Sequence, residues 1–143
     1  MQEISFERAL DVLRAKDPRY EREAYLFVRE ALDHTQQAIR NHGRKSLRHV
    51  TGQELLGGIR EFGLKQFGPM TMMLFEEWGI RSCEDFGEIV FNLVETGVLA
   101  KTPQDSRADF AGGYNFFEAF RKPYLPKAKP ARFATAAAPL WDK

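Results

Sequence analysis

Apolar residues recur every three or four positions along most of this chain, which is the spacing of an α-helix with one buried face. The clearest example covers residues 18–42. Its apolar stripe consists of Tyr20, Ala24, Phe27, Val28, Ala31, Leu32, Thr35 and Ile39. Asp17 and Pro18 are typical of a helix start, and Gly43 is typical of a helix end. The pattern predicts a mainly α-helical fold in which this segment is the longest helix.

Four shorter helices are predicted around it. Ser5 is a candidate cap for a first helix, and Thr51 with Glu54 has the spacing of a capping box. The remaining segments are bounded by glycine and proline and cover residues 51–68, 69–79 and 82–97. Gly57, Gly58, Gly63 and Gly87 fall inside these helices, where each costs on the order of 1 kcal/mol relative to alanine. Close helix packing would offset that cost, and Gly63 against Gly87 is one candidate contact.

The order of elements after residue 50 resembles a winged helix-turn-helix. Three predicted helices are followed by VLAK, which reads as extended chain, and residues 102–111 could form either a β-hairpin wing or a further short helix. We therefore predict a single helical domain over 1–121, with N-terminal helices and a basic linker in 1–50 and a winged-helix-like part in 51–121. Prolines at positions 123, 126, 130 and 139 predict an extended basic tail over 122–143.

The helix over 82–97 would be the recognition helix of such a domain, but its charge argues against duplex DNA. Its polar positions are Glu84, Asp85, Glu88, Asn92 and Glu95, with no lysine or arginine. Affinity for DNA comes mostly from cations that neutralise phosphates. This face suits a protein partner or is simply solvated. Candidate protein-interaction residues are Glu84, Glu88, Asn92 and Glu95 here, and Met72, Met73 and Trp78 on the preceding helix, where packing into the core is the alternative.

The positive charge is concentrated in two segments. Residues 1–120 contain 15 Lys/Arg against 19 Asp/Glu, whereas residues 121–143 contain six against one. Candidate nucleic-acid contacts are Arg44, Lys45, Arg48, Lys122, Lys127, Lys129 and Arg132. A tail of this kind could bind RNA or the ribosome, could simply keep the chain soluble, or could dock through an apolar anchor at Leu140 and Trp141.

Catalytic and metal-binding patterns are missing from the sequence. It contains no HExxH, CxxC, phosphate-binding loop or GxSxG, so we predict no cofactor and no metal. Glu30 and His34 have the spacing of two ligands on one helical face, but an ordinary surface pair explains them. Cys83 lies in the first turn of a predicted helix, beside Glu84. It is the single cysteine of the chain, which excludes an intramolecular disulfide. No long apolar run and no signal peptide are evident, which predicts a cytoplasmic protein without a membrane partner.

Several strings of residues resemble one family. They are Asp17-Pro-Arg-Tyr20, Ala24-Tyr-Leu-Phe-Val28, Arg48-His-Val-Thr-Gly-Gln-Glu54, Gln66-Phe-Gly-Pro69, Trp78-Gly-Ile80, Glu84-Asp-Phe-Gly-Glu-Ile-Val-Phe-Asn92, Lys101-Thr102, Asp105-Ser-Arg107 and Gly112-Gly-Tyr114. Over about residues 3–125 the chain is similar to a family of small bacterial proteins found mainly in planctomycetes and verrucomicrobia. That resemblance implies a bacterial cytoplasmic protein of unknown function and carries no activity, ligand or site residue with it.

Together these observations favour a non-enzymatic module, an adaptor or regulator, that binds another protein. The alternative is an RNA- or ribosome-associated protein that uses the basic linker and tail. An enzyme with an unfamiliar site is the third class, and it would require a deep pocket with convergent polar groups.

Overall fold

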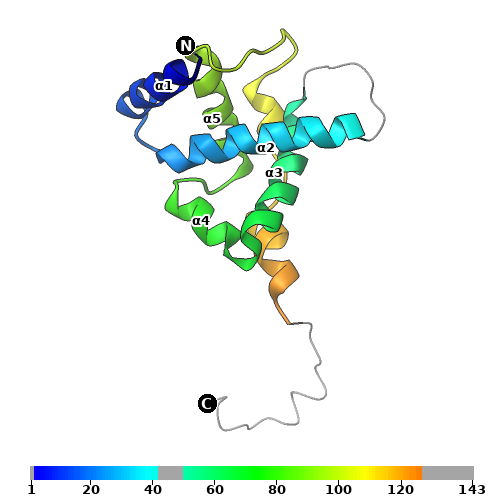
Figure 1. Ribbon diagram of the computed structural model, residues 1–143. Helices are drawn as coiled ribbons and strands as arrows, with labels where there is room; N and C mark the ends of the chain where they lie inside the picture. The colour runs from blue at the N-terminus through cyan, green and yellow to red at the C-terminus, as the bar shows by residue number, and fades with distance from the viewer. Residues whose placement is uncertain (1, 42–49, 127–143) are drawn as a thin grey trace, which may run out of the picture.

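The computed structural model describes residues 2–41 and 50–126 of the 143-residue chain (Figure 1). Its α-helices are α1 (Gln2–Lys16), α2 (Arg22–Asn41), α3 (Gly52–Phe67), α4 (Thr71–Glu77) and α5 (Cys83–Glu95). Short helical turns follow at η1 (Gly68–Met70), η2 (Arg107–Phe110), η3 (Phe117–Arg121) and η4 (Lys122–Tyr124). No β-strand occurs in these two ranges. The predicted mainly helical fold is confirmed.

Helix α2 crosses the molecule and packs against both α3 and α5 (Figure 1). Helix α1 packs on α2 and α5 at one end, whereas α4, η1 and η3 gather at the other. The described part of the chain ends beside this second group. None of the described helices combines the length and apolar composition needed to cross a bilayer.

Aromatic rings form the centre of the core. Phe75 on α4 is fully buried, and its ring centroid lies 5.1 Å from that of Phe27, 5.4 Å from that of Phe86 and 5.2 Å from that of Phe120. The aromatic segment 114–120 folds back onto this cluster. Phe116 and Phe120 are buried there. One set of rings therefore ties α2, α4, α5 and η3 together.

Helix α2 begins four residues later than predicted. The Asp17 side chain accepts hydrogen bonds from the backbone N–H and the guanidinium of Arg19, but residues 18–20 form a turn and a bend in place of the first turn of a helix. The Glu21 N–H donates to the Trp78 carbonyl at 3.1 Å instead, which joins this turn to the end of α4. The predicted capping box ahead of α3 is present, with Thr51 and Glu54 each accepting the other's backbone N–H.

Helix α3 lies close against α2 at Gly58. A Cβ atom at this position would lie 1.7 Å from the Thr35 hydroxyl oxygen and 2.9 Å from Thr35 Cβ. The predicted contact between Gly63 and Gly87 is not present. Gly63 faces Thr71 and Phe75, and Gly87 faces the ring of Phe110. Glycine therefore admits neighbouring side chains here, and the close approach of two helices is confirmed only at Gly58.

Residues 98–110 form turns and a short helix where the β-hairpin wing was one alternative. The Thr102 N–H donates to the Asp105 carboxylate at 2.9 Å, and the Ser106 N–H donates to the Asp109 carboxylate at 3.0 Å. The second of these pairs caps η2. Because side-chain caps satisfy the backbone locally, this stretch needs no strand partner. Within residues 102–111 only Arg107–Phe110 are helical, as one short turn, and Thr102 with Asp105 closes a turn ahead of it.

Candidate functional site

The acidic face of α5 is paired within the molecule. Glu88 lies 3.3 Å from the guanidinium of Arg19 and 3.3 Å from that of Arg107. Arg107 also reaches Glu95 at 3.8 Å, and its guanidinium stacks over the Phe91 ring. Two arginines from outside the helix thus neutralise carboxylates that the sequence presented as unpaired.

Asn92, predicted to be an exposed contact residue on the same face, is buried with 8% of its surface exposed. Its amide donates to the Asp17 carboxylate and to the Tyr25 hydroxyl, both at 3.0 Å. The hydrogen bonds from Arg19, followed by the one from Asn92, hold the pKa of Asp17 far below its usual range. Asn92 is therefore a structural link between α5 and the start of α2.

The N-terminal end of α5 is also occupied. Glu84 accepts a hydrogen bond from the Gly112 N–H at 3.3 Å, and its own backbone N–H and that of Gly112 lower its pKa. Asp85 accepts the backbone N–H groups of Arg81 and Ser82 and the Tyr20 hydroxyl, the last at 2.5 Å. The acidic helix is thus tied to three neighbouring segments, which leaves little of it to attract a partner by charge.

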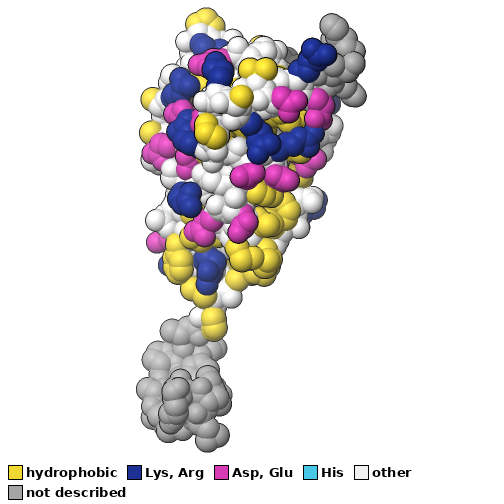
Figure 2. Space-filling model, turned by 90° about the vertical axis from the view of Figure 1, so that its left-hand side faces the viewer, with side chains coloured by type: hydrophobic (Ala, Val, Ile, Leu, Met, Phe, Trp, Pro, Cys, Tyr) yellow, Lys and Arg dark blue, Asp and Glu magenta, His cyan; other side chains and the backbone are white. Residues whose placement is uncertain are grey.

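A second candidate surface lies at the other end of the molecule. Among the described residues only six large apolar side chains are exposed, and five of them lie on η1, α4, η3, η4 and the residue after η4. We call these five the Met/Phe surface: Met70, Met73, Phe117, Tyr124 and Leu125, with exposed fractions of 47%, 49%, 45%, 44% and 41%. Figure 2 shows hydrophobic side chains gathered in the lower half of the face it presents.

Local helical geometry places these side chains outward. On α4, Thr71 and Phe75 point into the core and Trp78 packs against it, so Met73 falls on the opposite side. Phe116, which directly precedes the π-helical turn η3, and Phe120 within that turn are buried, whereas Phe117 is exposed. The turns η1 and η4 bring Met70 and Tyr124 to the same end. A hollow beside Met70 is lined by Pro69, Met70, Met72, Met73, Glu76 and Arg121.

The three interaction residues predicted around α4, Met72, Met73 and Trp78, differ from one another in how far they are exposed. Met73 is fully part of the exposed surface. Met72 is half-buried and reaches the hollow. Trp78 packs among Phe27, Phe67 and Phe75 in the core. The sequence did not identify Phe117, Tyr124 and Leu125 as members of an apolar surface. Phe117 lies in an aromatic-rich segment, which is typical of a core. Tyr124 and Leu125 fell in the predicted extended tail, whose first residues, Lys122–Tyr124, form the helical turn η4.

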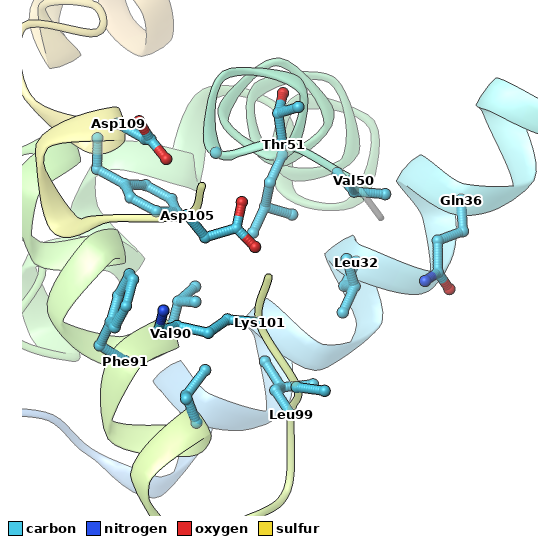
Figure 3. Close-up of a pocket in the computed structure, with 15 residues that line it drawn as sticks. Leu32, Gln36, Val50, Thr51, Val90, Phe91, Leu99, Lys101, Asp105 and Asp109 are labelled. Carbon is cyan, nitrogen blue, oxygen red and sulfur yellow. The ribbon is translucent and has the colours of Figure 1, made fainter. Parts of the chain in front are cut away.

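A pocket of about 200 Å³ opens between α2, α3, α5 and the loop before η2 (Figure 3). Its floor is apolar and includes Leu32, Val90 and Leu99, while Lys101, Asp105 and Asp109 stand at its polar side. Both carboxylates already accept backbone N–H groups as caps. The polar groups are thus explained by the local chain and do not form a nucleophile–base arrangement.

The remaining chemical candidates have ordinary structural partners. Cys83 is buried, and burial raises the pKa of its thiol, contrary to the lowering expected from a helix N-terminus. His34 lies 3.1 Å from Glu61 on α3 and stacks near Phe62, away from a metal-binding geometry with Glu30. In the part of the chain that the structure describes, no group of three or more metal-ligating side chains comes together.

Most of the basic candidates lie outside the described residues. These are Arg44, Lys45, Arg48, Lys127, Lys129 and Arg132, together with the anchor residues Leu140 and Trp141. Lys122 is described and is exposed on η4, beside the Met/Phe surface.

Comparison with known proteins identifies no match for this chain. No family model matches the chain, and neither a curated protein nor a solved structure is similar to it.

Proposed function

We propose that this protein is a non-enzymatic interaction module whose Met/Phe surface binds an apolar segment of another protein. The observation that carries the proposal is the gathering of five of the six exposed large apolar side chains at one end of the described molecule. Single exposed apolar residues are normal on a monomer, whereas a contiguous group marks a binding surface. Methionine is flexible and polarisable, so such a surface can adapt to an incoming aliphatic or aromatic side chain.

In this proposal the Met/Phe surface, and not the acidic face of α5, makes the main contact with the partner. A carboxylate that already pairs with an arginine gains little from a second cation, and it must first lose its existing partner. Glu88 and Glu95 share Arg107, so their contribution to a partner is smaller than the sequence implied. We also propose that α3, α4 and α5 keep the helix order of a winged-helix domain in a bacterial cytoplasmic protein, with a protein partner in place of DNA.

The alternative of RNA or ribosome binding rests on Arg44, Lys45, Arg48 and the basic tail, of which only Lys122 is described. It predicts recovery that depends on RNA and falls steeply with salt. Apolar docking predicts recovery that does not depend on RNA and is retained at moderate salt, because burial of apolar surface does not weaken as salt rises.

A pulldown with matched variants separates these outcomes. The bait is the full chain, its Met70→Gln/Met73→Gln variant, and Val12→Thr as the control, because Val12 is the sixth exposed apolar residue and lies on α1 at the opposite end. Fully burying one methionine is worth about 1.5–3 kcal/mol, so two half-exposed ones contribute on the order of 2 kcal/mol, or about thirtyfold in affinity.

We expect a defined protein that is recovered by the wild type and the control, survives RNase and moderate salt, and is lost with the double methionine variant. A partner that tolerates both glutamines but is lost with Glu88→Gln/Glu95→Gln would move the site back to α5. Recovery abolished by RNase would instead favour the RNA-associated alternative.

A further inference from the structure

The described chain ends at the Met/Phe surface. Tyr124 and Leu125 belong to the surface, and one more residue, Pro126, completes the described range. Seventeen residues, 127–143, follow in the sequence. This segment is therefore attached to the chain one residue after Leu125, a member of the Met/Phe surface.

The sequence of this segment matches the surface in both charge and polarity. Its first part carries Lys127, Lys129 and Arg132, and its last part, ATAAAPLW, is apolar and ends in Leu140 and Trp141. On the surface side, Glu76 and Glu77 of α4 are exposed and form no ion pair with any described residue.

The hollow beside these carboxylates adds the apolar half of the match. It is lined by Met70, Met72 and Met73 next to Glu76, with Arg121 as its one cation. In charge and polarity, a basic stretch followed by an apolar anchor therefore matches an acidic helix with an apolar hollow beside it.

We propose that Leu140 and Trp141 dock in the methionine-lined hollow of the same chain, so that the C-terminal segment occupies the Met/Phe surface until a partner displaces it. This inference rests on the proposed function, because it names the regulation of that same site. It assigns the basic tail to internal competition with the partner, in place of a role on nucleic acid.

The chain is long enough for this contact. Leu140 lies fourteen positions after Pro126, and an extended chain spans at most about 3.3–3.6 Å per residue, or roughly 46–50 Å over that stretch. Since Leu125 already belongs to the surface, the segment has to turn back only a short way. A tether of this length also holds its ligand at an effective concentration on the order of millimolar. Even a weak contact is therefore occupied within one molecule.

The two anchor residues are chemically suited to the hollow. Thioether sulfur interacts favourably with aromatic rings, and an indole offers a large apolar face with one N–H group. Glu76 provides an acceptor at the rim for that N–H. The adjoining carboxylates attract the lysines of the tether without fixing their positions.

The test uses the full chain labelled with 5-fluorotryptophan, which places one fluorine on Trp78 and one on Trp141. A Trp141→Phe variant assigns the two resonances. We expect the Trp141 resonance of the full chain to differ from that of a free peptide of residues 127–143. The difference should be lost in Met70→Gln/Met73→Gln, retained in Val12→Thr, and unchanged on dilution.

Each other outcome overturns the inference. A Trp141 resonance equal to that of the free peptide means that the segment is not docked. A difference that disappears on dilution means that the segment binds a second copy. A difference that survives the methionine substitutions means that it docks elsewhere.

These results are independent of the pulldown. If the proposed function holds and self-docking fails, the methionine variant still loses its partner while Trp141 behaves as in the free peptide. If self-docking holds and the proposed function fails, Trp141 responds to the methionine substitutions while no partner is lost. If both hold, Leu140→Ala/Trp141→Ala should raise the affinity of the full chain for its partner.

Discussion

Two adjacent glycines of α3 should respond to alanine with opposite sign. Gly57 is exposed, and a Cβ atom there would meet nothing within 4 Å. Gly58 faces the buried Thr35 of α2, whose hydroxyl oxygen would lie 1.7 Å from the new Cβ. Both positions are in the middle of the same helix, so the gain in helix propensity is the same for both substitutions.

The magnitudes follow from two competing effects. Replacing glycine by alanine inside a helix stabilises by about 0.5–1 kcal/mol, and at Gly57 nothing opposes this gain. At Gly58, Thr35 cannot relieve the contact by rotation, because its Cβ lies only 2.9 Å from the added atom. Overpacking of a core contact costs about 1–3 kcal/mol, and two contacts this short place the cost at the upper end. The net effect of Gly58→Ala is a loss of about 2 kcal/mol.

Urea unfolding followed by far-UV circular dichroism measures both variants against the wild type. We expect Gly57→Ala to raise the unfolding midpoint and Gly58→Ala to lower it. Adding Thr35→Ala to Gly58→Ala should recover part of the loss, since the shortest contact is then removed. Equal stabilisation by the two alanines would refute the reasoning, because α2 and α3 could not then meet at Gly58.

Three further perturbations test the core and its polar links. Phe75→Ala should lower the free energy of unfolding by about 3–5 kcal/mol in the same urea assay, since its ring contacts aromatic side chains from three other elements. Because Arg19 lowers the pKa of Asp17, the ionised carboxylate stabilises the fold above about pH 4, the usual aspartate pKa, and this contribution is lost as the pH falls further. Asp17→Asn should therefore flatten the decline of stability in acid, measured by unfolding at a series of pH values. Burial raises the pKa of Cys83, so a thiol reagent at neutral pH should modify it slowly in the native protein and quickly in denaturant.

The helices could be predicted from the sequence because their signals are local. A capping box needs only Thr51 and Glu54, and a buried stripe needs only its own spacing. The start of α2 could not be predicted in this way. The Asp17 side chain could cap a helix that begins at Pro18, or it could pair with the guanidinium of Arg19. In the structure it pairs with Arg19 and also accepts a hydrogen bond from Asn92, 75 residues away, and that second contact depends on tertiary structure.

The acidic face of α5 shows the same limit at the candidate site. Glu88 and Glu95 have no basic neighbour along their own helix, which made them look available to a partner. Their shared cation, Arg107, is the first residue of η2, and Arg19 comes from the turn before α2. Ion pairs between distant segments leave no pattern in the sequence. A charged face identified from the sequence of one helix is therefore weak evidence for a binding site.

The methionines of α4 present the opposite case, because their position could have been argued from spacing alone. Once Phe75 faces the core, Thr71 four residues before it and Trp78 three residues after it must share that side. Met73 then lies on the far side of the helix. Folding does not require an apolar residue there, since a charged one would cost the core nothing. One such side chain needs no explanation, but the Met/Phe surface gathers five of them at one end of the described molecule, and a group of this kind is best explained by a contact.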